Sequence, residues 1–371
     1  MSFYESLVNF LLHSLIGRIL RSIIVILNHF IPKRDDQILF ESIPSISDNP
    51  AQLYRYMKTR NENYRMIWVV DEPKDGFDAP QYVRNTISEF WQFLRSRYIV
   101  TSHGYHLMIR SENQVYVNLW HGMPIKAMGY AERAPSILLE GVSDENYYLI
   151  ATSTIMKNAL ATCFNQDARR IHITGQPRND KLFRTLSKSS WDDFRKVILY
   201  TPTYRDGGED ASIFSLEDYV EDRLKEFLRE HDAVFLVKLH PLDEGFRADE
   251  SGNIQVLDPA MDIHDILGGV DVLVTDYSSV YFDFLLLDRP IVFAVPDLEE
   301  YRRRRGFVLE PFEFWTPGPK VRTFSEFLAE LEKCINDEDY YRDERRMINE
   351  LVNQYQDDRS SERVYKLVWG D

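Results

Sequence analysis

Short apolar segments alternate with segments of helical pattern along most of this 371-residue chain. The segments form two series, 37–40, 66–70, 97–101, 115–119 and 147–151, then 197–200, 234–239, 254–257, 270–275 and 291–294. Parallel strands need long crossover connections, which are usually helices, so the alternation predicts an α/β fold with mostly parallel sheets. A chain of this length is also expected to form two domains rather than one.

The expected domain boundaries follow from the polar, turn-prone stretch LSKSSWDD at 186–193, which separates the two series. We expect an N-terminal amphipathic helix at 1–32, one domain at 33–188 and a second at 189–322. An acidic helical tail at 323–371 is expected to pack back across both domains. Two α/β domains that face each other place a site in the cleft between them, bordered by loops that follow strand ends.

The N-terminal segment is the compositional outlier. Residues 7–31 are mostly Leu, Ile, Val and Phe, enough to cross a bilayer, but Arg18 and Arg21 lie at the middle, where charge is costly in hydrocarbon. With Ser14 and Asn28 they form a polar stripe on an otherwise apolar helix, which is typical of a helix lying in the membrane interface. A core helix or an oligomer-forming helix is the alternative. A signal peptide fits poorly, because no small-residue cleavage site follows.

Composition narrows the class of protein. The chain is 44% hydrophobic and 28% charged, as globular enzymes are, and its net charge of −15 argues against nucleic-acid binding through a basic surface. Cys163 and Cys334 lack disulfide or metal-ligand spacing, which favours two buried thiols in a reducing compartment. The sequence has no Walker lysine loop, glycine-rich dinucleotide turn or zinc-spaced cluster, and its only Asp-x-Asp lies at 337–339 in the tail. No metal site is specified.

The stretch VLVTDYSSVYFDFLLLDRP at 272–290 joins a buried strand to a helix, with Asp276, Tyr277, Ser278 and Ser279 at the junction. The first N–H groups of a helix are unpaired and carry partial positive charge. Ser278 and Ser279 are expected to cap this helix and to present hydroxyls. The junction therefore predicts a socket for an anion such as a phosphate.

A second candidate site follows the strand at 115–119, where Trp120, His121 and Gly122 are followed by Lys126. Histidine titrates near neutral pH, so His121 can take a proton from an attacking hydroxyl. Gly122 lets a backbone or a ligand approach closely, and Lys126 is placed to meet an anion. The more frequent alternative is a hydrogen-bonded structural histidine.

Two further strand ends carry groups suited to phosphate. In KLHP, Lys238 and His240 are candidates for contact with phosphate oxygens, and the alternative is a capped strand end with a solvated lysine. In TPTYRD, Thr203 precedes Arg205, which can grip a phosphate through two hydrogen bonds. A surface pair between Arg205 and Asp206 would explain that arginine equally well.

Two other charged features are explained most simply by structural or solvent-exposed roles. In the turn GQPRND, Arg178 and Asp180 either pair to hold the turn, which we favour, or contact a ligand. The run Arg302–Arg305 is expected to be mostly a solvated face that Glu299 and Glu310 partly neutralise.

Taken in order, the motifs WHGMPIKAMG, GQPRND, LYTPTYRD, KLHP, TDYSSVYFDFLLLDRP, DLEEYRRRRGF and TPGP, within 115–319, resemble the CDP-glycerol glycerophosphotransferase family of wall teichoic acid primases and polymerases. The resemblance implies a GT-B-like fold of two Rossmann-like domains, with the acceptor on the first and the nucleotide donor on the second. It also implies membrane association and transfer of a polyol phosphate from a CDP-polyol to a lipid-linked or polymer acceptor, with release of CMP.

The resemblance also implies residue roles. His121 corresponds to the proposed general base and His240 to the histidine that contacts the donor phosphates. Arg205, Asp276, Ser278 and Ser279 fall in the family's donor pocket and Arg305 in its RGF element. Thr203 and Lys238, at neighbouring strand ends, are further donor-binding candidates. Trp120, Gly122 and Lys126 lie on the acceptor side. Met123 departs from the threonine that is common in the family, which affects the expected acceptor contacts.

The expected function is a single, primase-like transfer of glycerol phosphate from CDP-glycerol to a lipid-linked saccharide, because no large extra domain is present for tracking a growing polymer. The expected location is peripheral, on the cytoplasmic face of the cell membrane. No protein cofactor is implied, and Mg²⁺ remains open. The alternatives are a GT-B glycosyltransferase that uses a nucleotide sugar and a non-catalytic membrane-bound partner of the same fold.

Overall fold

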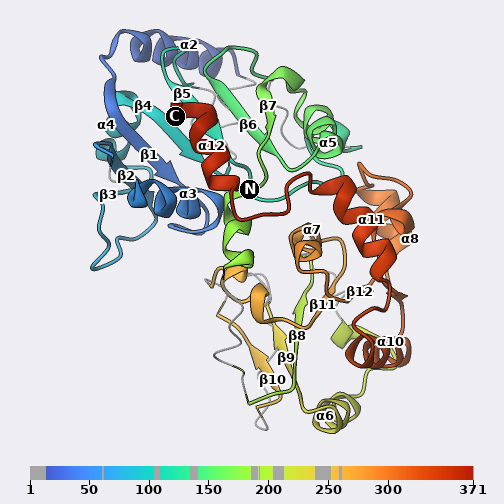
Figure 1. The fold of residues 1–371 in the computed structure, drawn as a ribbon. Helices are drawn as coiled ribbons and strands as arrows, with labels where there is room; N and C mark the ends of the chain where they lie inside the picture. The colour runs from blue at the N-terminus through green and yellow to red at the C-terminus, as the bar shows by residue number, and fades with distance from the viewer. Residues whose placement is uncertain are drawn as a thin grey trace.

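The computed structural model describes residues 14–60, 62–103, 109–133, 141–184, 191, 193–203, 213–238, 252–258 and 261–370. Within them the chain forms two parallel β-sheets flanked by helices, which lie one above the other in Figure 1. The expected α/β fold with two parallel sheets is confirmed. The division into domains at residues 32, 188 and 322 stays a prediction. The last strand of the first sheet ends at residue 173 and the first strand of the second sheet begins at residue 196, on either side of residue 188.

The N-terminal sheet has seven strands in the order β3-β2-β1-β4-β5-β6-β7, all paired in parallel. Its strands are β1 (Arg34–Glu41), β2 (Arg65–Val70), β3 (Gln81–Val83), β4 (Ser96–Thr101), β5 (Val115–Asn118), β6 (Tyr147–Ala151) and β7 (Ile171–Ile173). The strand order reverses between β1 and β4. Open parallel sheets bind ligands beyond the carboxyl ends of strands at such a reversal.

The C-terminal sheet has six strands in the order β10-β9-β8-β11-β12-β13, also parallel. Its strands are β8 (Lys196–Thr201), β9 (Ala233–Val237), β10 (Ile254–Val256), β11 (Val272–Thr275), β12 (Ile291–Ala294) and β13 (Lys320–Val321). Here the order reverses between β8 and β11. The loops that follow these two strands begin at residues 202 and 276, so the reversal lies at the predicted anion socket.

Helices cover both faces of each sheet, which explains why the strands are apolar runs rather than alternating patterns. All five residues of β9 are buried, for example. The helices are α2 (Leu15–Phe30), α3 (Asp48–Thr59), α4 (Ile87–Arg95), α5 (Thr154–Phe164), α6 (Glu221–Glu230), α7 (Val280–Phe284), α8 (Leu298–Arg304), α9 (Phe312–Trp315), α10 (Phe324–Asn336), α11 (Arg342–Val352) and α12 (Ser360–Trp369). Short 3₁₀ turns include η4 (Pro177–Phe183), η6 (Ile263–Asp265) and η8 (Leu285–Leu287).

The C-terminal helices connect the two halves of the molecule. Helix α10 packs on β12 and β13, α11 contacts η8 and α5, and α12 contacts α3 and η4. The start of α12 is held by Asp180, whose carboxylate accepts hydrogen bonds from the backbone N–H groups of Ser360 at 2.8 Å and Ser361 at 2.9 Å. Asp180 therefore anchors the end of the chain to the N-terminal half.

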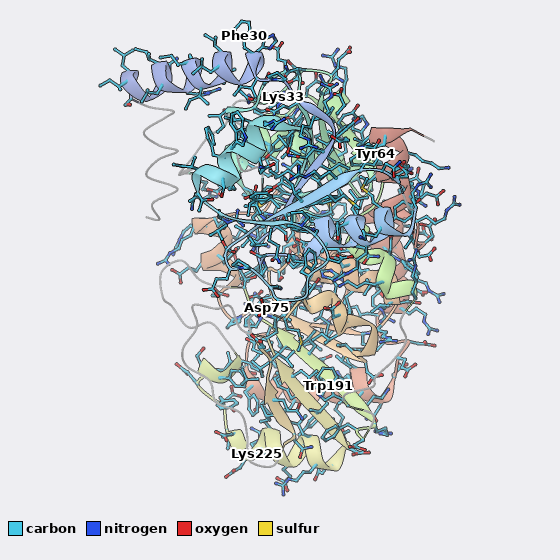
Figure 2. All side chains as sticks on the ribbon, turned by 90° about the vertical axis from the view of Figure 1, so that its left-hand side faces the viewer. Phe30, Lys33, Tyr64, Asp75, Trp191 and Lys225 are labelled. Atoms are coloured by element: carbon cyan, nitrogen blue, oxygen red, sulfur yellow. The ribbon has the colours of Figure 1, made fainter. Side chains whose placement is uncertain are left out.

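Helix α2 has Asn28 of the polar stripe against the protein and its large apolar residues outside, and Arg18 of the same stripe is exposed. Gly17 and Asn28 are buried, and the Asn28 amide donates to the carbonyl oxygen of Ile109 at 2.9 Å and to Gln114 Oε1 at 2.8 Å. The exposed large apolar residues on this helix are Leu15, Ile16, Ile19, Leu20, Ile23, Ile26, Leu27 and Phe30. Figure 2 shows α2 across the end of the molecule remote from the C-terminal sheet. In the described part of the chain, no helix is long and apolar enough to span a membrane.

Candidate active site between the two sheets

His121 lies just beyond β5, at the carboxyl edge of the N-terminal sheet, and is partly exposed. Its Nδ1 is 3.0 Å from the carbonyl oxygen of Ser102, which follows β4. A carbonyl oxygen only accepts, so Nδ1 carries the proton and Nε2 presents a lone pair. Among the described residues, none forms a hydrogen bond with Nε2. The imidazole is therefore in the tautomer that a general base at Nε2 requires.

Two aromatic rings pack against His121. The His103 ring stacks on it with centroids 4.3 Å apart and planes 12° apart, and the Trp120 ring lies 4.1 Å away at 34°. Burial lowers the pKa of His121, and this effect exceeds the raising influence of the hydrogen bond to Ser102. Burial, followed by the neighbouring His121, lowers the pKa of His103 to about 2. Both imidazoles are therefore neutral near pH 7.

Gly122 brings the His121 loop into contact with the start of α7. A Cβ atom on Gly122 would lie 2.4 Å from Ser279 Oγ and 3.3 Å from Ser279 Cβ. Gly122 also has a φ of +152°, a value that residues with a side chain rarely adopt. The catalytic candidate of one sheet and the anion socket of the other therefore meet directly.

Arg178 joins three segments behind this contact. Its Nη1 donates to the carbonyl oxygen of His121 at 2.8 Å and to Asp48 Oδ1 at 3.0 Å, and its Nη2 donates to Asp283 Oδ2 at 2.6 Å. Burial works to lower the pKa of Arg178, but the charges of Asp283 and Asp48 outweigh it and raise the pKa. The favoured sequence interpretation, a pair between Arg178 and Asp180, is wrong, because the Asp180 carboxylate holds α12 instead.

Asp283, in α7, is the acceptor at the centre of this buried cluster. Besides Arg178, its carboxylate accepts from Gln176 Nε2 at 2.6 Å and Asn179 Nδ2 at 2.8 Å, and His264 Nε2 lies 3.2 Å away. Burial acts to raise the pKa of Asp283, but the positive charge of Arg178 prevails and lowers it to about 2. The carboxylate therefore remains ionised and ties α7 to η4.

On the C-terminal sheet, Asp276 holds the loop after β8 in place through hydrogen bonds. Its carboxylate accepts from the backbone N–H of Thr203 at 2.9 Å and from the Thr203 hydroxyl at 2.7 Å. Asp276 is only 2% exposed, so its contacts position the loops at the strand-order reversal. Thr203 is the last described residue before Arg205, whose placement, like that of His240, lies outside the described residues.

The expected cap at Ser278 and Ser279 differs in the structure. Helix α7 begins at Val280 and spans five residues, and Ser279 occupies the N-cap position without a side-chain capping hydrogen bond. Both serines are partly exposed. The sequence prediction was wrong on capping because Ser279 has helical backbone angles, whereas a capping residue is usually extended. The serine hydroxyls are not committed to the helix end.

A backbone bridge also connects Lys126 with the arginine-rich segment. Lys126 pairs with Phe307 in an antiparallel bridge, in which the N–H of Ala127 donates to the carbonyl of Gly306 at 3.0 Å. Arg305 Nε donates to the carbonyl oxygen of Ala127 at 3.3 Å. Arg305 therefore contacts the N-terminal half. Its role in donor binding stays a prediction.

Other predicted residues have less specific surroundings. Lys238 follows β9, and burial lowers its pKa despite the opposing charges of Asp258 and Asp262. Arg302 pairs with Glu299, Glu310 and Glu313, as expected for a neutralised surface run. In the described segments no group of three or more His, Cys, Asp or Glu side chains is placed to hold a metal ion.

Sequence reasoning missed the partners of His121 and Arg178. His103 lies two residues beyond β4, at the same sheet edge as His121. This position after a strand was the only feature of the sequence that could have indicated a contact with His121. Asp283 lies inside the quoted motif TDYSSVYFDF but has no distinguishing pattern of its own. Asp48 begins α3 with a φ of +60°, which the sequence does not indicate.

Comparison with known proteins agrees with this architecture. The chain is 29% identical over 342 residues to the teichoic acid poly(glycerol phosphate) polymerase of Bacillus spizizenii, covering 82% of this chain and 85% of that one. It is 27% identical over 369 residues to the teichoic acid glycerol-phosphate transferase of Staphylococcus aureus, covering 90% and 92%. A structure of the wall teichoic acid polymerase TagF with CDPG has a TM-score of 0.79 at 24% identity, over 99% of this chain and 96% of that one, which confirms the GT-B-like fold.

The family model described as CDP-Glycerol:Poly(glycerophosphate) glycerophosphotransferase matches residues 23–370, nearly the whole chain. The match covers both sheets, the loops that carry His121 and Ser279, and the C-terminal helices. The protein therefore belongs to the CDP-glycerol:poly(glycerophosphate) glycerophosphotransferase family of transferases.

Proposed function

We propose that this protein transfers glycerol phosphate from CDP-glycerol to a membrane lipid-linked saccharide and releases CMP, in a primase-like step of teichoic acid or related cell-surface polymer synthesis. The observation that carries the proposal is the neutral His121, with Nε2 available beside the Gly122–Ser279 contact. The match to most of the length of a glycerol-phosphate transferase supports a single transfer. The chain also matches most of the length of a poly(glycerol phosphate) polymerase. The number of units added per acceptor must therefore be measured.

The proposed reaction is an in-line displacement at the glycerol-bearing phosphorus. The acceptor hydroxyl oxygen forms a new bond to that phosphorus while the bond from phosphorus to the CMP oxygen breaks. The hydroxyl proton goes to His121 Nε2, and CMP leaves with the electron pair. A positioned base of this kind typically contributes 10²–10⁴-fold in rate. Position and charge stabilisation supply the rest in phosphoryl transfer.

The donor is proposed to lie at the carboxyl edge of the C-terminal sheet, where its strand order reverses. Ser278 and Ser279 offer uncommitted hydroxyls there, and Lys238 follows the neighbouring strand β9. Arg205 and His240 are proposed to contact the diphosphate. These cations and donors would stabilise the charge that develops on the leaving CMP.

Helix α2 supports peripheral attachment to a membrane. Its outward apolar residues have no covering among the described residues, whereas Asn28 is held by hydrogen bonds to the protein. Immersing each such side chain in the acyl boundary is worth up to about 1.5–3 kcal/mol. Attachment through α2 would bring the lipid-linked acceptor to the N-terminal half.

The deciding experiment measures CMP release from CDP-glycerol and CDP-ribitol with a lipid-linked disaccharide. Phosphorus-labelled donor should deliver its label to the acceptor, and one glycerol phosphate should be added per acceptor. A nucleotide-sugar glycosyltransferase would leave the acceptor unlabelled and would be active with nucleotide sugars instead. Absence of turnover with every donor would favour a non-catalytic partner of the same fold. Products with many glycerol phosphate units per acceptor would indicate a polymerase rather than a primase.

A further inference from the structure

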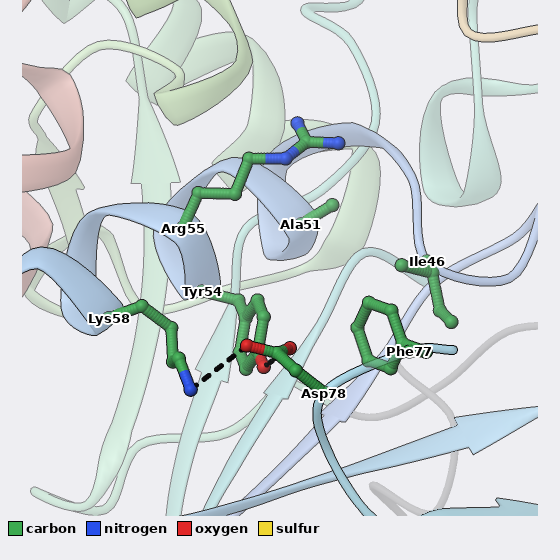
Figure 3. Close-up of a pocket in the computed structure, with 7 residues that line it drawn as sticks. All are labelled: Ile46, Ala51, Tyr54, Arg55, Lys58, Phe77 and Asp78. Carbon is green, nitrogen blue, oxygen red and sulfur yellow. Dashed lines mark hydrogen bonds and ion pairs between the residues drawn. The ribbon is translucent and has the colours of Figure 1, made fainter.

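A cavity of about 290 Å³ lies beside α3 in the N-terminal half (Figure 3). Its lining residues are Ile46, Ala51, Tyr54, Arg55, Lys58, Phe77 and Asp78. They come from α3 and from the loops after β1 and β2. Ile46, which lines the cavity, belongs to the loop that leaves β1 at the carboxyl edge of this sheet, the edge at which His121 follows β5. Its volume is at the small end of the range for ligand pockets.

The floor of the cavity is apolar and fixed. The rings of Tyr54 and Phe77 stack with centroids 5.7 Å apart and planes 30° apart. The Tyr54 hydroxyl donates to Asp78 Oδ1 at 2.6 Å, and Lys58 Nζ lies 3.0 Å from Asp78 Oδ2. The only carboxylate in the lining is therefore matched by Lys58, which leaves Arg55 as the unbalanced charge.

Arg55 is exposed and makes only a long contact, 3.5 Å from its Nη1 to Gln52 Oε1. No carboxylate within the described residues pairs with it, although acidic side chains outnumber basic ones by 59 to 44 in the chain. Figure 3 shows its side chain running back along α3 above Ala51 and away from Asp78. An arginine so placed presents a planar pair of donors that suits a phosphate.

Helix α3 connects this cavity with the reaction centre. Asn49 Nδ2 donates to the carbonyl oxygens of Leu119 at 3.1 Å and Trp120 at 2.9 Å, next to His121. Arg55 is six residues further along the helix, about 9 Å away at 1.5 Å per residue. The opposite wall belongs to the loop 71–80, and Figure 2 shows Asp75 in this loop at mid-height, between the two sheets. The cavity therefore lies within reach of an elongated molecule whose hydroxyl meets His121.

We propose that this cavity is an acceptor subsite, in which Arg55 binds a phosphate of the acceptor and the Phe77 ring packs against the C–H face of an adjoining sugar or polyol. The proposal rests on the function proposed above and extends it to acceptor selection. The phosphate has two sources, the linkage between saccharide and lipid or a glycerol phosphate already attached to the saccharide. The chemistry of recognition is the same for both.

The test compares Arg55→Ala and Phe77→Leu with Arg169→Ala, which removes an 81% exposed arginine of the same sheet's far edge. Arg55→Ala should raise the acceptor KM about tenfold, as loss of a charge-assisted hydrogen bond does, with kcat and the CDP-glycerol KM unchanged. Arg55→Lys should give a smaller rise, since it keeps the charge without the paired donors. Arg169→Ala should match the wild type.

Three acceptors identify the phosphate. If the lipid linkage binds Arg55, the tenfold penalty appears with the unprimed lipid-linked disaccharide. If an attached unit binds, the penalty appears only with acceptor that already carries one glycerol phosphate, measured as its inhibition constant against the unprimed acceptor, because a primase-like enzyme does not elongate it. A phosphate-free glycoside of the same disaccharide should show no penalty. An unchanged KM for the unprimed acceptor together with an unchanged inhibition constant for the primed one, or an equal rise in the donor KM, overturns the subsite.

A measurement independent of turnover separates this proposal from the proposed function. Soluble glycerol phosphate oligomers should bind the wild-type protein in calorimetry and bind Arg55→Ala about tenfold more weakly. If the wild type releases no CMP from any donor yet this difference is present, the proposed function fails and the subsite stands. Equal binding by both proteins, or none by either, removes the subsite whatever the turnover.

Discussion

Gly122 and Ser279 lie so close that no side chain fits between them, since a Cβ on Gly122 would stand 2.4 Å from Ser279 Oγ. This contact joins the loop after β5, the neighbour of β4, to the loop after β11 at the strand-order reversal of the C-terminal sheet. It places a neutral histidine from one sheet beside uncommitted hydroxyls from the other. The candidate active site is therefore made by the two halves together rather than by either half alone.

Gly122→Ala should lower kcat strongly, because the methyl group forces the two loops apart. Backbone strain from the positive φ adds about 1–3 kcal/mol of destabilisation. Gly76→Ala is the matched control, since its φ is +72° and nothing lies within 4 Å of a Cβ there. Steady-state CMP release and urea unfolding measure the two effects. Adding Ser279→Ala to Gly122→Ala should recover part of the lost stability, because it removes the hydroxyl that the methyl group would meet. Equal losses for Gly76→Ala and Gly122→Ala would contradict the contact.

His121→Ala should reduce kcat by about 10²–10⁴-fold while CDP-glycerol still binds. Burial lowers the pKa of His121, so the wild type should keep its base form to a pH below the ordinary histidine value of 6.5. The acidic limb of kcat/KM is therefore expected below pH 6.5. CMP release across pH, with donor binding by calorimetry, checks both points. Turnover like the wild type would remove His121 from the mechanism.

His103 should act on the reaction only through His121. Its own pKa of about 2 keeps it neutral in any assay, so it adds no limb to the pH profile. His103→Ala should admit water to His121, raise the pKa of His121 and move the acidic limb upward. His103→Phe keeps a stacked ring and should restore the wild-type limb. An unmoved limb in His103→Ala would show that the stack has no influence on the base.

Asp283→Asn should destabilise the fold by up to about 3–5 kcal/mol, because it leaves the buried Arg178 charge paired with Asp48 alone. Urea unfolding measures this loss. Asp358→Asn, which breaks the exposed pair with Arg184, should change stability by less than about 1 kcal/mol. In the wild type the lowered pKa of Asp283 means that its stabilisation is complete above its ordinary value of 3.8 and is lost as pH falls toward about 2. Similar losses for both variants would contradict the assignment.

Membrane binding should depend on the outward face of α2. Substituting Ile19, Ile23 and Ile26 by Glu together should abolish flotation with liposomes, since three charges cannot enter the acyl boundary. A control with equal added charge replaces Val220, Met261 and Phe314, which are exposed apolar residues elsewhere. That variant should float like the wild type. Flotation by both variants would assign membrane binding to another surface.

The sequence predicted the local elements well because each strand and its following loop carry their own signal. The strand at 291–294 was expected with the bounds that the structure has, and β11 begins two residues inside the expected 270–275. His121, Gly122 and Ser279 were identified from their positions after strands. The failed prediction of capping at Ser279 shows the limit of that method, since the N-cap geometry depends on how the chain leaves β11.

By itself, then, the sequence determined the α/β class, the order of strands and helices and the loops that carry the chemistry, because hydrophobic pattern and strand-end position are local properties. Only the tertiary structure decided which side chains meet. Arg178 donates a hydrogen bond to Asp283, which is 105 positions away in the sequence, and does not pair with the nearby Asp180. The Asp180 carboxylate instead accepts hydrogen bonds from the start of α12. Asn28 of α2 is buried for the same reason, since its hydrogen-bond partners Ile109 and Gln114 come from a distant segment. Such pairings follow from the packing of whole elements, which no local pattern records.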